Sequence, residues 1–164
     1  MVHAQDLVKT FGDVRAVDGV TFQVARGEIF AFLGPNGAGK TTTIQMLTTL
    51  LRPTSGAMSL DGVDPIGRPL DARRTFGIVF QDPSLDNELT AYENMTLHGV
   101  LYHVPRRQRV DRIETLLTLF ELWDRRTSLV KTFSGGMRRR LEIARGLLHT
   151  PKILFLDEPT LGLD

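Results

Sequence analysis

Cysteine is absent from the 164-residue chain, which excludes disulfides and thiolate metal sites. Long hydrophobic runs are also absent: no stretch approaches the roughly 18 apolar residues of a membrane-spanning helix. We therefore expect any membrane role to depend on a partner protein. Neither sign of charge is in excess, since 20 Lys and Arg against 19 Asp and Glu leave a net charge of +1. This balance gives no electrostatic reason to expect nucleic acid as a partner.

The residues that are present are typical of one globular domain, with 41% hydrophobic and 24% charged side chains. Residues 7–24 predict short strands joined by turns, an antiparallel β portion. The apolar run Ile29–Leu33 is too short for a helix, and it predicts a buried strand of the parallel-sheet kind. Ile44, Leu47 and Leu51 then recur at helical spacing and predict a helix that ends near Arg52 and Pro53.

The second half of the chain mixes further strands with helices. Residues 54–62 and 77–80 predict strands, and residues 153–156 predict another buried strand. Residues 91–101, 106–122 and 134–149 predict helices. The stretch from 82 to about 133 indicates a helical insertion in an α/β core, and with the helix that follows it forms a helical subdomain over about 82–150. The expected fold is a single α/β domain over residues 1–164, with a mostly parallel sheet.

The segment Gly34–Thr41 satisfies the phosphate-loop pattern G-x-x-x-x-G-K-[ST] in full, between a predicted strand and a predicted helix. Glycines let successive backbone N–H groups turn towards phosphate oxygens, and the helix start adds a positive dipole end. Lys40 is expected to reach the β- and γ-phosphates, and Thr41 to offer a hydroxyl to Mg²⁺. The expected ATP-binding residues are Gly34, Pro35, Asn36, Gly37, Ala38, Gly39, Lys40, Thr41 and Thr42.

Two carboxylates, Asp157 and Glu158, directly follow the predicted strand Ile153–Leu156. In α/β sheets, ligands bind beyond the carboxyl ends of the strands. Asp157 is therefore expected to hold Mg²⁺, and Glu158 to act as general base on the attacking water. A solvated acidic turn is the alternative interpretation, and the upstream phosphate loop weighs against it.

A second glycine motif, Ser134-Gly135-Gly136, precedes another predicted helix and is again suited to an anion. Taken together, the motifs resemble those of the ABC transporter ATPase family. Gly34–Thr42 resembles Walker A, Gln81 the Q-loop glutamine, Ser134–Met137 the signature, and Ile153–Glu158 Walker B. The run Leu161–Asp164 is similar to the D-loop, and Phe11 matches the aromatic residue that stacks on adenine.

The resemblance implies a fold, a mechanism and partners. It implies a P-loop NTPase core that binds and hydrolyses ATP with Mg²⁺, in which Gln81 contributes to the metal site and catalysis. Two such domains are expected to pair head to tail, so that each ATP lies against the Ser134, Gly135, Gly136 and Met137 of a second copy or homologous ATPase domain. A separate transmembrane permease is the other implied partner, which places the chain in the cytoplasm, peripheral to the membrane. Its similarity to drug-resistance and polysaccharide exporters favours an exporter.

Some residues depart from the family pattern. Phe133 stands where leucine is usual, and Met137 where glutamine is frequent, at positions that tolerate change. The family domain continues past the D-loop with further strands and a switch histidine, so we expect C-terminal strands to be missing here. The four histidines, expected to be surface or packing residues, are His3, His98, His103 and His149. On this basis we expect weak ATP binding and slow hydrolysis.

Other functions remain open at this point. A soluble ABC-type ATPase of translation or DNA repair is one alternative, although an insertion of about fifty residues without heptads favours a transporter. A nucleotide-binding fragment without turnover is another, and a GTPase or small-molecule kinase on the same loop is a third. The basic run Arg138–Arg140 is interpreted as a solvated helix face, because no aromatic residues alternate with it as base stacking requires.

Overall fold

The computed structural model describes residues 1–80 and 84–157, and the chain divides into two compact units at the bond between Phe76 and Gly77. Each unit is described by itself. Within the two described ranges, no helix combines the length and the apolar character needed to cross a bilayer.

The first unit is built on an antiparallel sheet of three strands in the order β2-β1-β3. Strand β1 (Val2–Phe11) pairs with β2 (Val14–Val24) on one side and with β3 (Ser55–Leu60) on the other. The tight connection between β1 and β2 is possible because Gly12 takes a left-handed φ of 56°. The predicted antiparallel N-terminal portion is therefore confirmed.

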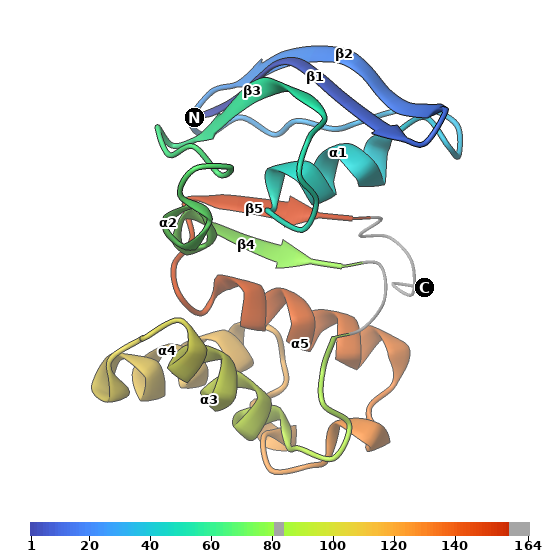
Figure 1. Ribbon diagram of the computed structural model, residues 1–164. Helices are drawn as coiled ribbons and strands as arrows, with labels where there is room; N and C mark the ends of the chain where they lie inside the picture. Colours follow the sequence, from blue (N-terminus) through green and yellow to red (C-terminus); the bar gives the residue numbers. More distant parts are fainter. Residues whose placement is uncertain (81–83, 158–164) are drawn as a thin grey trace. The chain divides into compact units, whose positions relative to one another are not determined.

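Helix α1 (Lys40–Leu47) lies along one face of this sheet (Figure 1), and Met46 and Leu47 are fully buried. The helix ends earlier than the predicted stop near Arg52. The Thr48 hydroxyl donates to the Ile44 carbonyl at 2.8 Å, and Thr49 has a left-handed φ of 65°. Apolar spacing alone could not reveal this local termination. The short helix α2 (Pro69–Thr75) was not predicted, because seven residues carry too little periodicity.

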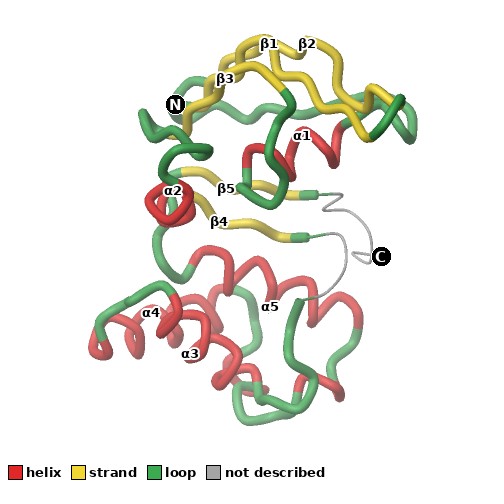
Figure 2. The backbone as a smooth tube through the Cα atoms, viewed as in Figure 1, coloured by secondary structure: helices red, strands yellow, loops and turns green. Residues whose placement is uncertain are grey.

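The run Ile29–Leu33 corrects the prediction of a buried strand. The chain between β2 and α1 is a loop (Figure 2), and Ile29 and Leu33 are 98% and 92% exposed. Phe30 instead stacks on Phe22 of β2, with ring centroids 5.1 Å apart. A strand needs a ladder partner as well as apolar side chains, and no strand in residues 1–80 or 84–157 pairs with this run.

The second unit contains β4 (Phe76–Val79) and β5 (Ile153–Leu156), which form a two-stranded sheet. The two arrows run in the same direction (Figure 1), so the pair is parallel, as expected for the α/β class. Both strands were predicted. The burial predicted for residues 153–156 is wrong in part, because Leu154 and Leu156 are 36% and 38% exposed.

Helices fill the rest of the second unit. Helix α3 (Ala91–Leu101) begins at a capping box in which Thr90 and Glu93 satisfy each other's backbone N–H groups. Helix α4 (Arg106–Leu119) ends slightly before the predicted Leu122, near Glu121 with its left-handed φ of 57°. Two 3-10 turns, η1 (Trp123–Arg125) and η2 (Val130–Thr132), then lead to α5 (Gly135–Leu147).

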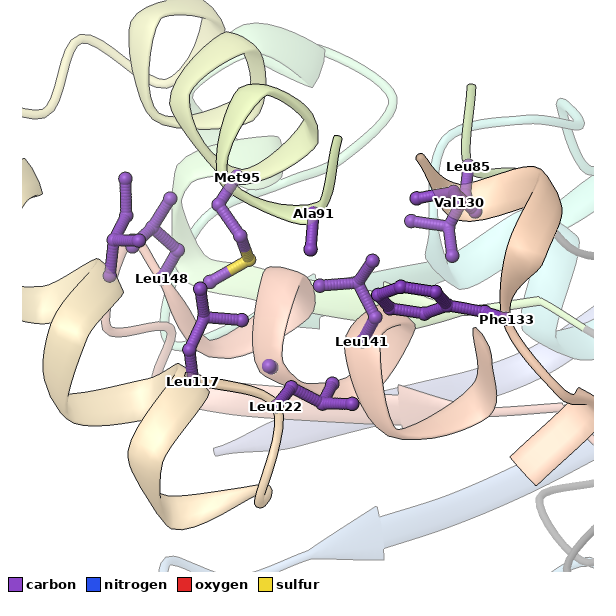
Figure 3. Packing of buried hydrophobic residues seen from close by; sticks show 11 residues of the cluster. Leu85, Ala91, Met95, Leu117, Leu122, Val130, Phe133, Leu141 and Leu148 are labelled. Carbon is purple, nitrogen blue, oxygen red and sulfur yellow. The ribbon is translucent and has the colours of Figure 1, made fainter. Parts of the chain in front are cut away.

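The apolar core of the second unit lies between these helices, each of which contacts the other two. Met95 extends from α3 towards Leu117 of α4, while Phe133 lies beside Leu141 of α5 (Figure 3). These side chains are at most 5% exposed. Phe133 precedes the predicted signature motif, so this core fixes the position at which α5 begins.

Candidate functional site: two glycine-rich helix starts

The predicted phosphate loop leads directly into α1 within the first unit. Gly34, Gly37 and Gly39 have φ values of 151°, 82° and 79°, which glycine adopts without steric cost. A hydrogen bond of 3.2 Å from the Ala38 N–H to the Pro35 carbonyl closes the turn. Residues 34–38 are exposed to solvent. The loop thus forms the open, backbone-lined turn that the sequence predicts.

Gly39 is the N-cap of α1, and no side chain caps this helix start. The first N–H groups of a helix have no acceptor within the helix, so an uncapped start can receive an anion. A Cβ at Gly39 would lie 2.5 Å from the Ala16 carbonyl oxygen and 3.1 Å from Val17 Cγ2. Strand β2 therefore passes so close to the loop that only glycine fits at this position.

Lys40 holds its own loop together. Its Nζ donates to the Gly34 carbonyl at 2.7 Å and to the Pro35 carbonyl at 2.8 Å. The ammonium group thus lies over the loop, where the pattern predicts a phosphate contact. Thr41 and Thr42 follow in the first turn of α1, and both are partly buried. No residue from 34 to 42 is acidic, so the segment fits a polyphosphate, and the hydroxyl groups at its end suit Mg²⁺.

Phe11, the predicted adenine platform, lies at the end of β1 and is 50% exposed. It pairs across the hairpin with Val14, two residues before the Ala16 that contacts the Gly39 position. The Lys9 ammonium lies 5.1 Å from the ring centroid of Phe11. The ring is accessible to a ligand at this end of β1, and its stacking on adenine stays a prediction.

Asp157, the predicted metal ligand, follows β5 in the second unit. Its N–H donates to the Val79 carbonyl at 3.0 Å, which extends the pairing of β4 and β5 by one residue. Asp157 is only 8% exposed, and its carbonyl accepts a hydrogen bond from Arg139. The residue is therefore held at the carboxyl end of the sheet, where ligands of α/β proteins bind.

The second glycine motif forms the start of α5 in the same unit. Ser134 is the N-cap, and its Oγ accepts a hydrogen bond from the Met137 N–H at 3.2 Å. Nothing lies within 4 Å of a Cβ built on Gly135, so the approach to this helix start is open. Phe133 and Met137 pack in or against the apolar core, which explains why large apolar side chains suit both positions.

The basic run on α5 corrects the prediction of a solvated face. Arg139 is 5% exposed and forms an ion pair with Glu142, of which only 2% is exposed. Arg140 does reach outwards, to Glu121 at 2.9 Å. A run of like charges cannot tell which of its members faces inward. The Arg and Glu three residues apart were the available signal, because such pairs share one helix face.

Two histidines pack in the second unit, as predicted for this residue type. The rings of Tyr102 and His149 stack with centroids 4.0 Å apart, and His98 lies 4.5 Å from Tyr102. Burial lowers the pKa of His98 to about 3, and the positive charge of Arg145 and the nearby His149 act in the same direction. Burial also lowers the pKa of Arg145. His98 is therefore neutral in the folded protein near pH 7.

A model of the family described as ABC transporter matches residues 17–161, which include both glycine-rich helix starts and the acidic pair. The chain belongs to the ABC transporter family.

Relatives of this ABC chain are named for drug resistance and for export. The daunorubicin resistance ATP-binding protein DrrA3 of Streptomyces coeruleorubidus is 45% identical over 95% of the chain and 49% of that protein. The Nod factor export ATP-binding protein I of Ralstonia nicotianae is 40% identical over 100% of the chain and 51% of that protein. The chain thus spans about half the length of these relatives.

A solved ABC structure supports the fold. A dimeric ATP-binding cassette in a post-hydrolysis state, bound to ADP and Pi, has a TM-score of 0.88 and 29% identity. The similarity covers 100% of this chain and 76% of the cassette. The α/β fold with an antiparallel portion and a helical part is therefore confirmed.

Three predicted ABC site residues lie outside the described residues: Gln81, Glu158 and Asp164. Of the others, Phe11 and residues 34–42 belong to the first unit, and Ser134–Met137 and Asp157 to the second. Sequence reasoning missed the buried Arg139 and Glu142, which lie on the helix that follows the signature motif.

Proposed function

We propose that the chain is the ATP-binding and ATP-hydrolysing subunit of an ABC transporter. The observation that carries this proposal is the open loop into α1, which lacks a side-chain cap, has no room for a Cβ at Gly39 and carries the Lys40 ammonium above it. An uncapped helix start beside an ammonium group suits the polyphosphate of ATP. The cytoplasm, where ATP is available, is the proposed location.

In the proposed mechanism, Lys40 and the backbone of residues 34–42 bind the phosphates, and Phe11 stacks on the adenine. Thr41, Asp157 and Gln81 would hold Mg²⁺, which supplies positive charge to the phosphate oxygens. Glu158 accepts a proton from water as the water oxygen forms its bond to the γ-phosphorus. The bond from that phosphorus to the bridging oxygen breaks, and ADP and phosphate leave.

A second copy or a homologous domain completes the proposed site. Its Ser134, Gly135 and Gly136 contribute the helix start of α5 to the γ-phosphate, and Asp164 is the proposed D-loop residue. The dimeric form of the solved relative supports this arrangement. A separate membrane subunit is the proposed partner through which hydrolysis powers export, and the names of the two relatives support the direction.

The variant Lys40→Met tests the proposed ATP site. It removes the ammonium from the loop and leaves a side chain of similar length, so ATP affinity should fall by about 10-fold or more, since a hydrogen bond to a charged group contributes about 1.5–3 kcal/mol. A fluorescent ATP analogue and phosphate release measure binding and hydrolysis. Lys131→Met, which removes a surface lysine paired with Glu88, is the matched control. Unchanged binding by Lys40→Met would contradict the proposal.

The transporter role needs a separate experiment. The tagged chain, expressed in its native host and cross-linked before lysis, should be recovered with a membrane-spanning protein. Recovery with ribosomes or DNA instead would favour a soluble ABC ATPase. Loss of the membrane partner would leave the ATP site itself unaffected, so the two proposals can fail independently.

A further inference from the structure

Helix α5 carries three charged side chains at intervals of three residues, Arg139, Glu142 and Arg145, which face two distant segments of the second unit. Arg139 donates from one nitrogen to the Phe80 carbonyl at 2.5 Å and from another to the Asp157 carbonyl at 3.3 Å. Phe80 follows β4 and Asp157 follows β5. One guanidinium thus joins α5 to the carboxyl ends of both strands.

Glu142 extends the network to Ser84. Its Oε1 accepts from the Ser84 N–H at 2.7 Å and lies 3.5 Å from the Ser84 hydroxyl. Arg145 donates to the Ser84 carbonyl at 2.8 Å and also to its hydroxyl. Both polar groups of the Ser84 backbone are therefore bonded to α5. Ser84 and Phe80 are the described residues on either side of 81–83, the segment that contains Gln81.

Burial of this network has an unfavourable desolvation free energy. Arg139 and Glu142 are 6% and 2% exposed at their side chains and 3.5 Å apart, so both charges lose most of their hydration. Apolar side chains of similar volume often serve stability equally well at such positions. The charged side chains add positional specificity, because each of their hydrogen bonds fixes where a particular backbone group lies.

We propose that Arg139 and Glu142 are positioning residues that couple the start of α5, with Ser134, to Asp157 and to the backbone on either side of Gln81. This inference rests on the proposed ATPase function and deepens it. The signature motif, Asp157 and the backbone of Phe80 and Ser84 then move as one body. A change at the γ-phosphate side of one ATP is thereby transmitted to the helix start that contacts the ATP of the partner copy.

The double variant Arg139→Met/Glu142→Leu tests the coupling, since it removes both of the nearly fully buried charges together, while Arg145 keeps its hydrogen bonds to Ser84. The matched control is Arg140→Met/Glu121→Gln, which removes the neighbouring, exposed ion pair of the same helix. Hydrogen exchange in the full chain should be faster in the double variant for peptides that contain Phe80 and Ser84, and unchanged in the control. Thermal melting of both variants should remain cooperative.

Two further readouts separate positioning from a purely structural role. Added Mg-ATP should change the exchange of residues 134–137 in the wild type but not in the double variant. Turnover should fall about 10-fold in the double variant, which is within the range of typical coupling between two sites. The ATP dissociation constant should stay within about twofold, because α1 is untouched. Exchange near Ser84 that matches the wild type, or full turnover in the folded double variant, would overturn the inference. A wild type that binds no ATP would instead refute the proposed function, and the exchange near Ser84 would still decide the positioning.

Discussion

The two glycine-rich helix starts resemble each other in sequence but differ in how their first N–H groups are capped. The start of α1 has no side-chain cap and is held by the folded-back Lys40. The start of α5 is capped by its own Ser134. The bodies of the helices also differ, because α1 buries only Thr43 besides its apolar residues, whereas α5 buries the ion pair of Arg139 and Glu142 beside its apolar residues. The start of α1 therefore offers its N–H groups without a side-chain cap, whereas at the start of α5 the Met137 N–H already has an acceptor within the single chain.

Gly39→Ala should break the first helix start with the largest effect. A Cβ there meets the Ala16 carbonyl, and an alanine at φ 79° adds about 1–2 kcal/mol of backbone strain. ATP affinity should fall about 100-fold, measured with a fluorescent analogue. The matched control is Gly37→Ala, at φ 82° with nothing within 4 Å, which carries the strain without the clash. Equal losses in the two variants would show that the close approach of β2 is unimportant.

His98→Gln should make the second unit less sensitive to acid. In the folded protein the pKa of His98 is about 3, so its ring stays neutral above that pH. In the unfolded chain the histidine has its ordinary pKa near 6.5 and binds a proton below it. Stability therefore falls as pH drops from about 6.5 towards 3, by up to about 1.4 kcal/mol per pH unit, and the group has no effect above that window.

Urea unfolding between pH 4.5 and 8 measures this slope. His98→Gln should unfold with a smaller pH dependence than the wild type below pH 6.5. The control His3→Gln removes an exposed histidine on β1 and should retain the wild-type slope. The same slope in all three proteins would contradict the assignment of the acid sensitivity to His98.

Phe11→Ala should weaken ATP binding, because it removes the ring that is proposed to stack on adenine near the start of α1. Stacking on an aromatic ring contributes about 1–3 kcal/mol per base, so ATP affinity should fall about 10-fold. Tripolyphosphate competes for the loop without a base, and its affinity should be unaffected. Phe11→Trp, which retains a stacking surface, is the matched control. Equal weakening for ATP and tripolyphosphate would contradict the adenine role of Phe11.

Ser134→Ala should have the smallest effect on the isolated chain. Loss of the cap costs about 1 kcal/mol, while ATP affinity stays unchanged because α1 is intact. Calorimetry and nucleotide binding measure the two. Ser134→Asn keeps a capping oxygen, so it should restore stability but not the proposed contact to the ATP of a partner copy. Turnover restored together with stability would indicate that Ser134 acts only as a cap.

The elements were predictable where local chemistry specifies them. The loop at 34–41, the helix start at Ser134 and the helix at 91–101 follow from glycines, caps and spacing, which neighbouring residues determine. The run 29–33 was predicted wrongly, because apolar character does not identify the strand with which a segment pairs. Phe30 stacks on Phe22 across the intervening turn. This is a tertiary contact, which the propensities of single residues cannot reveal.

The site shows the same division. Residues that act through their own motif, such as Lys40 and Thr41, could be named from spacing alone. Arg139 could not, because its role depends on the carbonyl groups of Phe80 and Asp157, which lie 59 and 18 residues away in the chain. A charged residue is exposed by default, and only tertiary structure shows when its partners bring it inside.

The hydrogen bonds of Lys40 to Gly34 and Pro35 have a consequence for the entropy of binding. Because the ammonium already spans the loop, most of the conformational freedom of these residues is lost when the protein folds. An arriving polyphosphate exchanges one set of oxygen acceptors for another and orders little further backbone. Association should therefore be limited mainly by diffusion and by release of water from the phosphates, as expected for a preorganised site.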